Sequence, residues 1–198
     1  SAEWDRENIL SLQTHLRVTW VGTVRWEGGV PAEEEAAVTA VLRELNCRPV
    51  FVSGSVHMNF YKKFCKGVLW PVLHHIADVY GPIDAQTTGG QGQQELWYWY
   101  STVNRKFRDK IVEVYHEGDL IWIHGFHLLL LPSFLTRVVR TARIGVFFHT
   151  PFPSSEIWRT LPFREELLRG ILGADQVGFH LYEYARHFLT SCLRMLGL

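Results

Sequence analysis

Residues 147–179, FFHTPFPSSEIWRTLPFREELLRGILGADQVGF, constrain the fold more than any other stretch of the chain. Val146–Phe148 form a short apolar run, which is typical of a strand buried on both faces of a parallel sheet. His149 follows at the point where that strand would end, and in open α/β sheets ligands gather at the carboxyl ends of the strands. The stretch therefore predicts a buried strand that leads into a ligand-facing loop.

The loop after this strand combines rigid and polar residues. Pro151 and Pro153 restrict its backbone. Ser154 and Ser155 precede Glu156, which predicts a side-chain cap at a helix start whose free N–H groups can bind an anion. A structural turn around a hydrogen-bonded histidine explains the same residues about as well, although ligands favour such crevices.

Strand patterns and helix patterns alternate along the whole chain. Strands are expected at 18–21, 49–52, 120–123, 144–148 and 176–179. Helices are expected from Pro31, over 57–80 with a break near Pro71, over 96–114, and near 128–140, 165–172 and 182–196. This alternation predicts an α/β fold with a Rossmann-like parallel sheet flanked by helices, in a single domain over residues 1–198.

Two neighbouring segments in the middle of the chain differ sharply in pattern. Residues 81–94 are rich in Gly and Gln and follow no predicted strand, so we expect a flexible surface loop there and not a phosphate-binding loop. In the next segment apolar residues recur at steps of three and four, which predicts a long amphipathic helix that covers one face of the sheet. These residues are Leu96, Tyr100, Val103, Phe107, Ile111 and Val114.

The composition is that of a soluble globular domain. The chain has 198 residues, 47% of them hydrophobic, and its 20 Lys and Arg balance 20 Asp and Glu, which argues against nucleic acid or a membrane as the main partner. The apolar stretches at 120–131 and 144–148 are too short to span a bilayer, and no secretory signal is visible. Cys47, Cys65 and Cys192 are widely spaced and odd in number, which indicates reduced thiols in a cytoplasmic protein.

Neither a metal site nor a serine hydrolase is supported by the sequence. His124 and His127 lie three residues apart and His74 and His75 are adjacent, but no carboxylate or thiolate completes either pair at a recognisable spacing. The G-x-S-x-G motif of α/β-hydrolases is absent from the sequence. We therefore expect no metal ion and no cofactor.

Tyr61 and Trp70 lie nine residues apart in FYKKFCKGVLW. At 3.6 residues per turn this separation is two and a half turns, so a continuous α-helix would place the two rings on opposite faces. They would converge only if the helix breaks. Two ordinary core aromatics are the alternative interpretation.

The motif HTPFPSSEIWRTLP, with GADQVGFHLYEYARHFL after it and FYKKFCKGVLWPVLHH before it, closely resembles the trehalose-6-phosphate synthase family. The resemblance runs from about Trp20 to the end of the chain, in the family's order. These proteins are retaining glycosyltransferases that join UDP-glucose to glucose 6-phosphate. The resemblance implies one half of a two-domain GT-B glycosyltransferase, namely the N-terminal, acceptor-side domain, with the nucleotide-sugar domain absent from this chain.

The resemblance also implies roles for individual residues. Tyr61 and Trp70 match positions of the glucose 6-phosphate pocket, and Trp20 matches a tryptophan of the same region. His149 matches the catalytic-site histidine that faces the transferred glucose and holds one of its hydroxyls, with Thr150 beside it.

The chain departs from the family at IHGFHL. Synthases normally read His-Asp-Tyr-His-Leu there, and the aspartate contacts the acceptor sugar, whereas this chain has Gly125 and Phe126. A hydrogen bond to a charged group contributes roughly 1.5–3 kcal/mol, and about 1.4 kcal/mol corresponds to a factor of ten. We therefore predict a degenerate acceptor position at Gly125, with acceptor handling weakened about ten- to a hundredfold.

Three functions follow from these observations. The first is the acceptor-side domain of an enzyme that transfers glucose from UDP-glucose to glucose 6-phosphate in trehalose biosynthesis; the chain alone is expected to be inactive. The second is a non-catalytic regulatory or scaffold domain of a trehalose synthase/phosphatase complex, with synthase or phosphatase subunits as partners. The third is a sugar-phosphate sensor, which needs only the pocket of Tyr61, Trp70 and His149.

Overall fold

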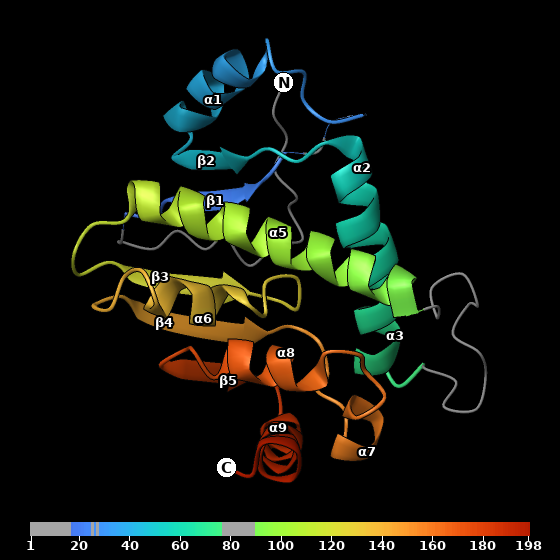
Figure 1. The fold of residues 1–198 in the computed structure, drawn as a ribbon. Helices are drawn as coiled ribbons and strands as arrows, with labels where there is room; N and C mark the ends of the chain where they lie inside the picture. Colours follow the sequence, from blue (N-terminus) through green and yellow to red (C-terminus); the bar gives the residue numbers. More distant parts are fainter. Residues whose placement is uncertain (1–16, 25, 27, 77–89) are drawn as a thin grey trace. The chain divides into compact units, whose positions relative to one another are not determined.

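The computed structural model describes residues 17–24, 26, 28–76 and 90–198 (Figure 1). Contacts between Cα atoms divide the chain into two compact units, one that ends at Ser53 and one that begins at Gly54. No helix among these residues is long and apolar enough to cross a membrane. The single domain expected over 1–198 stays a prediction.

The N-terminal unit is one β-α-β element. Strand β1 (Trp20–Thr23) pairs in parallel with β2 (Cys47–Val50), and helix α1 (Glu35–Glu44) connects them. Both strands lie two residues from their predicted positions. The helix begins four residues after Pro31, because a turn closed by the Glu34 N–H and the Pro31 carbonyl, 2.9 Å apart, comes first.

The C-terminal unit contains a three-stranded parallel sheet in the order β3-β4-β5 (Figure 1). Its strands are β3 (Leu120–His124), β4 (Arg143–Phe148) and β5 (Gln176–Phe179). Each coincides with its predicted range to within one residue at either end. The predicted Rossmann-like parallel α/β fold is confirmed.

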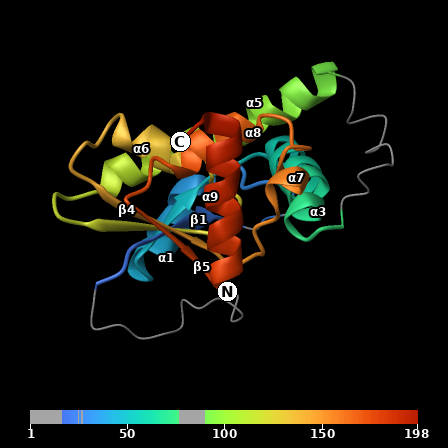
Figure 2. The same cartoon turned by 90° about the horizontal axis from the view of Figure 1, so that it is seen from below.

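One face of this sheet is buried and the other is more open. Ile144, Val146 and Phe148 are at most 3% exposed, whereas the alternate residues of β4 are partly exposed. Helices α6 (Leu131–Thr136) and α8 (Arg164–Ile171) lie on the same side of the sheet in Figures 1 and 2. Right-handed crossovers that proceed in one direction across a parallel sheet place their helices on the same face. Strand β4, which was predicted to be buried on both faces, is therefore deeply buried on only one.

Helix α5 (Gly90–Val114) is the longest element and packs against α6 and against the π-helix η2 (Met58–Leu69). Five of its six predicted core positions are buried, at 8% exposure or less. The predicted loop at 81–94 is wrong for residues 90–94, which are helical because Gln93 and Gln94 favour a helix and the apolar stripe follows them directly. Residues 81–89 lie outside the described part of the chain.

Residues 54–73 form one continuous helical segment with an unusual centre. It runs through α2 (Gly54–His57), the π-helix η2 (Met58–Leu69) and α3 (Trp70–Leu73). The break expected near Pro71 does not occur, since the helical backbone continues from η2 through this proline to Leu73. The helix ends at Leu73, earlier than expected, and residues 77–80 lie outside the description.

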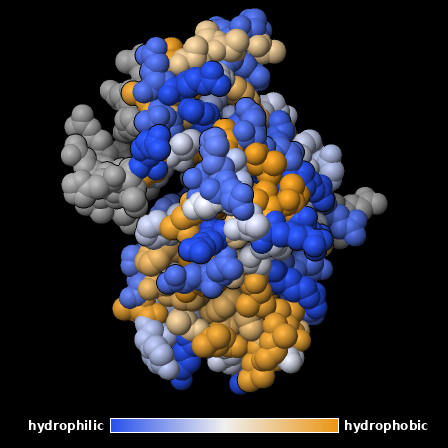
Figure 3. Space-filling view, turned by 90° about the vertical axis from the view of Figure 1, so that its left-hand side faces the viewer, coloured by the Kyte–Doolittle hydropathy of each residue, from blue (hydrophilic) through white to orange (hydrophobic). Residues whose placement is uncertain are grey.

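Two helices complete the C-terminal unit. The short α7 (Ser155–Trp158) packs against α9 (Tyr182–Leu196), which also contacts β5. Helix α9 has its predicted bounds and ends at Gly197, whose φ of 72° suits a glycine cap. Figure 3 shows apolar side chains gathered at the level of α9, whose exposed residues include Leu189 and Leu193.

Candidate functional site

Three histidines stand at the carboxyl ends of the three parallel strands. His124 is the last residue of β3, His149 follows β4 directly, and His180 follows β5 directly. Nδ1 of His124 lies 2.9 Å from Nε2 of His149 in a hydrogen bond, and the ring centroids of His149 and His180 are 5.8 Å apart. His149 therefore occupies the strand-end position that the sequence predicted.

The hydrogen-bonded histidine pair favours the uncharged state. Burial, and then the charge of His149, lowers the pKa of His124. Burial, and then the charge of His180, lowers the pKa of His149. Two neutral rings share one proton in their bond, so each keeps a second nitrogen that can donate to or accept from a ligand hydroxyl.

The π-helix brings Tyr61 and Trp70 to one side. A helix with i→i+5 hydrogen bonds has about 4.4 residues per turn, so nine residues make about two full turns. The ammonium of Lys66 lies 5.8 Å from the Tyr61 ring centroid and 3.7 Å from the Trp70 ring centroid, which places both rings around one side chain. The rings thus converge without the break that α-helical spacing demanded.

The loop after β3 joins this aromatic cluster to the histidine pair. The His127 ring stacks on Tyr61 with centroids 5.6 Å apart, and Phe126 lies against Trp70 with centroids 5.7 Å apart. Gly125 follows the last residue of β3. Its N–H donates to the Phe147 carbonyl of β4 at 2.9 Å. We call Tyr61, Lys66, Trp70, Phe126 and His127 the aromatic cluster.

Helix α5 holds the backbone of this loop through two fully buried polar residues. The Tyr100 hydroxyl donates to the Phe126 carbonyl at 3.1 Å and accepts from the Leu129 N–H at 3.0 Å. The Asn104 amide donates to the His127 carbonyl at 3.3 Å and accepts from the Leu130 N–H at 3.2 Å. Sequence reasoning placed Tyr100 in the core and missed Asn104, although an asparagine four residues after a core position was a visible signal.

Gly125 has a φ of 76°, a conformation that L side chains rarely adopt. A Cβ atom built there would lie 3.4 Å from Nδ1 of His127. Phe126, the next residue, is 2% exposed. A side chain at this position would therefore be strained by the backbone angle.

Both faces of the Trp70 indole are covered. Lys66 lies 3.7 Å from its centroid and the His74 ring stacks on it at the same 3.7 Å separation, which two groups can do only on opposite faces. His74 is fixed by its Nδ1–H, which donates to the Trp70 carbonyl at 3.0 Å. The indole consequently presents its edge, and not a face, to a ligand.

The two remaining predicted binding residues lie in different units. Thr150 is 7% exposed, and its hydroxyl has no hydrogen-bond partner within the described ranges. Trp20 lies on β1 in the N-terminal unit and is half-buried. The binding roles of both residues stay predictions.

The serine cap expected at the start of α7 is confirmed in position but not in its hydrogen bond. Ser154 is the N-cap residue, but its side chain makes no capping hydrogen bond. The Ser155 hydroxyl is buried and accepts from the Arg194 guanidinium at 3.0 Å, which joins α7 to α9. With only four residues, α7 provides a packing contact and no anion site.

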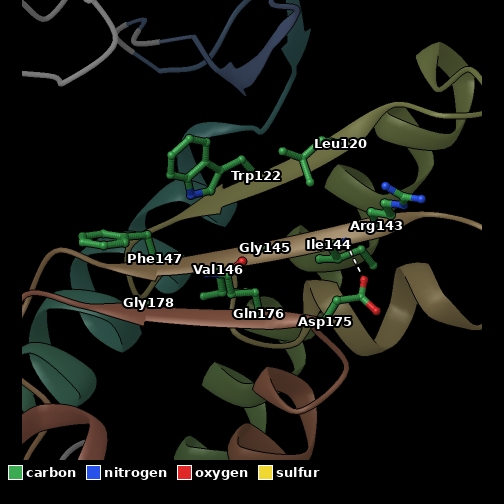
Figure 4. A pocket seen from close by; sticks show the side chains of 10 residues that line it. All are labelled: Leu120, Trp122, Arg143, Ile144, Gly145, Val146, Phe147, Asp175, Gln176 and Gly178. Atoms are coloured by element: carbon green, nitrogen blue, oxygen red, sulfur yellow. Dashed lines mark hydrogen bonds between the residues drawn. The ribbon is translucent and has the colours of Figure 1, made fainter. Parts of the chain in front are cut away.

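A separate cavity of about 530 Å³ lies along the open face of the sheet (Figure 4). Gly145 and Gly178 line it beside Trp122, which is 61% exposed, and Phe147, whose ring centroid lies 4.9 Å from that of His149. Sequence reasoning did not identify this cavity. Within residues 17–24, 26, 28–76 and 90–198, no three His, Cys, Asp or Glu side chains gather in a way that could hold a metal ion.

Comparison with solved structures places the fold among trehalose enzymes. The N-terminal domain of a Candida albicans trehalose-6-phosphate phosphatase has a TM-score of 0.71 and 37% identity, over 84% of this chain and 35% of that one. An alpha,alpha-trehalose-phosphate synthase (UDP-forming) from Burkholderia xenovorans in complex with glucose-6-phosphate has a TM-score of 0.65 and 25% identity, over 75% of this chain and 31% of that one. A structure from E. coli with UDP-2-fluoro glucose has a TM-score of 0.67 and 25% identity, over 89% of this chain and 43% of that one.

Sequence comparison gives the same result. The model of glycosyltransferase family 20 matches residues 5–198. Alpha,alpha-trehalose-phosphate synthase (UDP-forming) 6 of Arabidopsis thaliana is 42% identical over 204 residues, which cover 98% of this chain but 23% of that protein. The chain thus spans about a quarter of the length of this relative. It belongs to the trehalose-phosphate synthase family, glycosyltransferase family 20.

Proposed function

We propose that this chain is the acceptor-side domain of a trehalose-phosphate synthase-type protein. In the intact protein it binds glucose 6-phosphate in the aromatic cluster and presents His149 to the glucose that UDP-glucose supplies. The observation that carries this proposal is the convergence of Tyr61 and Trp70 around Lys66, beside the loop that leads to the histidine pair. The solved relatives with glucose-6-phosphate and UDP-2-fluoro glucose support the same substrate pair.

Each group offers chemistry that suits this role. The Tyr61 phenol can donate to a phosphate oxygen, and the Trp70 edge can line a sugar ring. Neutral His149 can hold a sugar hydroxyl by a hydrogen bond without acting as a base. Transfer with retention depends on positioning and on stabilising charge at the sugar carbon, so a domain of this kind contributes mainly preorganised contacts.

We further propose that the chain alone does not transfer glucose, because it spans only 23% of the length of the Arabidopsis thaliana synthase that it resembles. The three cysteines are free and buried, as reduced thiols in the cytoplasm would be.

Calorimetric titration of the chain with glucose 6-phosphate tests the acceptor role. We expect saturable binding that Tyr61→Phe weakens, because this change removes only the hydroxyl. Tyr98→Phe is the matched control, since Tyr98 is 57% exposed on α5 and lies outside the aromatic cluster. Equal affinities for Tyr61→Phe and the unchanged chain would exclude Tyr61 from the site.

The second candidate is a non-catalytic regulatory or scaffold domain of a trehalose synthase/phosphatase complex. Gly125 favours it, because a glycine stands where the family resemblance implies an acceptor carboxylate. Its φ of 76° also disfavours a side chain at this position. The similarity to the N-terminal domain of a trehalose-6-phosphate phosphatase agrees with this reading. Synthase activity of the full-length parent with glucose 6-phosphate and UDP-glucose would exclude this candidate.

A further inference from the structure

The helical segment that carries Tyr61 and Trp70 is strongly basic, although the chain as a whole is neutral. Residues 54–76 contain Lys62, Lys63 and Lys66 but no Asp or Glu, and residues 120–136, which include the loop of the aromatic cluster, contain no acidic residue either. None of the ion pairs found among the described residues involves these lysines. Their positive charge is therefore uncompensated within the part of the chain that the structure describes.

Two of these lysines lie close to the Tyr61 ring. The ammonium of Lys62 lies 5.9 Å from the Tyr61 centroid, and that of Lys66 lies 5.8 Å from it. The two residues are four apart, close to one turn of the π-helix, so their side chains leave the helix on nearly the same side. Lys66 also lies within 6.0 Å of the Phe126 centroid.

We propose that Lys66, assisted by Lys62, binds the phosphate group of a phosphate monoester at the aromatic cluster, next to the Tyr61 hydroxyl. This inference rests on the proposed acceptor function and adds the residues that recognise the charged end of the ligand. An ammonium forms a stronger interaction with a phosphate dianion than with aromatic faces, so Lys66 can exchange its contact with Trp70 for the anion. The Tyr61 phenol offers a hydroxyl donor in addition to the two ammonium groups.

The neighbouring imidazole agrees with an anion at this place. Burial, and then the charge of Lys66, lowers the pKa of His127 to about 4, so His127 contributes neutral polar atoms at pH 7. Its Nε2 atom is buried without a hydrogen-bond partner inside the described ranges. The cluster thus holds a positive lysine and an unsatisfied polar atom side by side, and no negative group.

The test is calorimetric titration of the chain with glucose 6-phosphate, glucose and inorganic phosphate. Lys66→Met keeps the length of the side chain and removes its charge, and Lys66→Arg keeps the charge. Lys63→Met removes one charge from the same helix at an exposed position and is the matched control. Circular dichroism of each variant verifies the fold.

We expect Lys66→Met to lose about ten- to a hundredfold in affinity for glucose 6-phosphate, because one charge-assisted contact is lost. Lys66→Arg and Lys63→Met should retain most of the affinity. Equal losses in Lys63→Met and Lys66→Met would overturn the inference, because the effect would then be one of net charge. Unchanged affinity in Lys66→Met would overturn it as well.

The ligands separate this inference from the function on which it rests. If inorganic phosphate binds as tightly as glucose 6-phosphate and Lys66→Met abolishes both, Lys66 is the anion ligand but the sugar pocket is refuted. If glucose binds as well as its phosphate and Lys66→Met changes neither, the sugar pocket stands and the lysine site is refuted. Absence of binding by the unchanged chain refutes both.

Discussion

The imidazoles of His124 and His149 share a hydrogen bond of 2.9 Å between the ends of neighbouring parallel strands. This bond joins two segments that are 25 residues apart in sequence and fixes the direction of the His149 ring. His124 therefore orients the residue predicted to face the transferred sugar, whereas sequence reasoning considered it only as a metal ligand.

Replacing His149 with glutamine should raise the pKa of His124. The charge of His149 is one cause of the lowered pKa of His124, and an uncharged amide cannot exert it. Titration of His124 followed by NMR is the measurement. His116→Gln serves as the control, since His116 is exposed and lies before β3. A pKa of His124 unchanged by His149→Gln would show that burial alone sets it.

The chain should lose stability as the pH falls from about 6.5 to about 4. His127 has a folded-state pKa of about 4, below its usual 6.5, so the unfolded chain binds more protons in this window. A shift of this size corresponds to about 3 kcal/mol of unfolding free energy, which is present above pH 6.5 and lost on acidification.

Urea unfolding at pH 7 and at pH 4.5 measures this loss. His127→Phe should reduce the difference in unfolding free energy between pH 7 and pH 4.5. Part of the difference should persist, because the lowered pKa values of His124 and His149 act in the same direction. If His127→Phe leaves the pH dependence intact, His127 is not its source.

A side chain at position 125, including that of Gly125→Asp, should destabilise the fold. Because φ at Gly125 is 76°, a side chain there costs about 1–2 kcal/mol of folding stability. Gly125→Asn should cost less than Gly125→Val, since asparagine tolerates this region and β-branched residues do not. Urea unfolding of the three variants gives the order, and equal losses would mean that backbone strain is not the cause.

Tyr100→Phe should destabilise the fold by about 1–3 kcal/mol, because the Phe126 carbonyl and the Leu129 N–H each lose a buried hydrogen-bond partner. Tyr98→Phe, on the exposed side of the same helix, should change stability by less than about 0.5 kcal/mol. Thermal unfolding compares the two. Similar midpoints for both variants would mean that the loop after β3 does not depend on α5.

Gly170→Ala should be strongly destabilising, by about 1–3 kcal/mol or more, because a Cβ atom on α8 would lie 2.4 Å from the Leu129 carbonyl oxygen. Gly67→Ala offers the contrast. Its Cβ would meet only the Lys62 carbonyl oxygen, at 3.6 Å, so the added methyl group should be neutral or stabilising within the helix. Chemical unfolding of both variants checks the pair; a stable Gly170→Ala would show that α8 can move away from the loop.

Much of the fold followed from periodicity. Helix α9 and strand β5 have their predicted bounds, because an amphipathic stripe and a short apolar run with clear ends leave few alternatives. Residues 90–94 were predicted to be a loop because they are rich in Gly and Gln. They are helical, because they lie directly before the apolar stripe and form the first turn of α5.

The site was harder to predict than the fold. His149 was placed correctly from the end of its strand, a local signal. The positive φ of Gly125 is invisible in a sequence, since glycine accepts any backbone angle. The partners of Asn104 depend on how α5 packs on the loop after β3, which no local pattern encodes.

Because Met58–Leu69 form a π-helix, the number of residues between Tyr61 and Trp70 determines the directions in which their two rings point. If one residue between Tyr61 and Trp70 were deleted, the two positions would be eight residues apart. At ordinary α-helical spacing the ring of Trp70 would then point roughly 80° away from the direction of Tyr61. The chemistry of each side chain would be unchanged, yet the two would no longer face one ligand. In this segment the number of residues is therefore as much a determinant of binding as their identity, and related sequences that lack one residue here should not be expected to share its pocket.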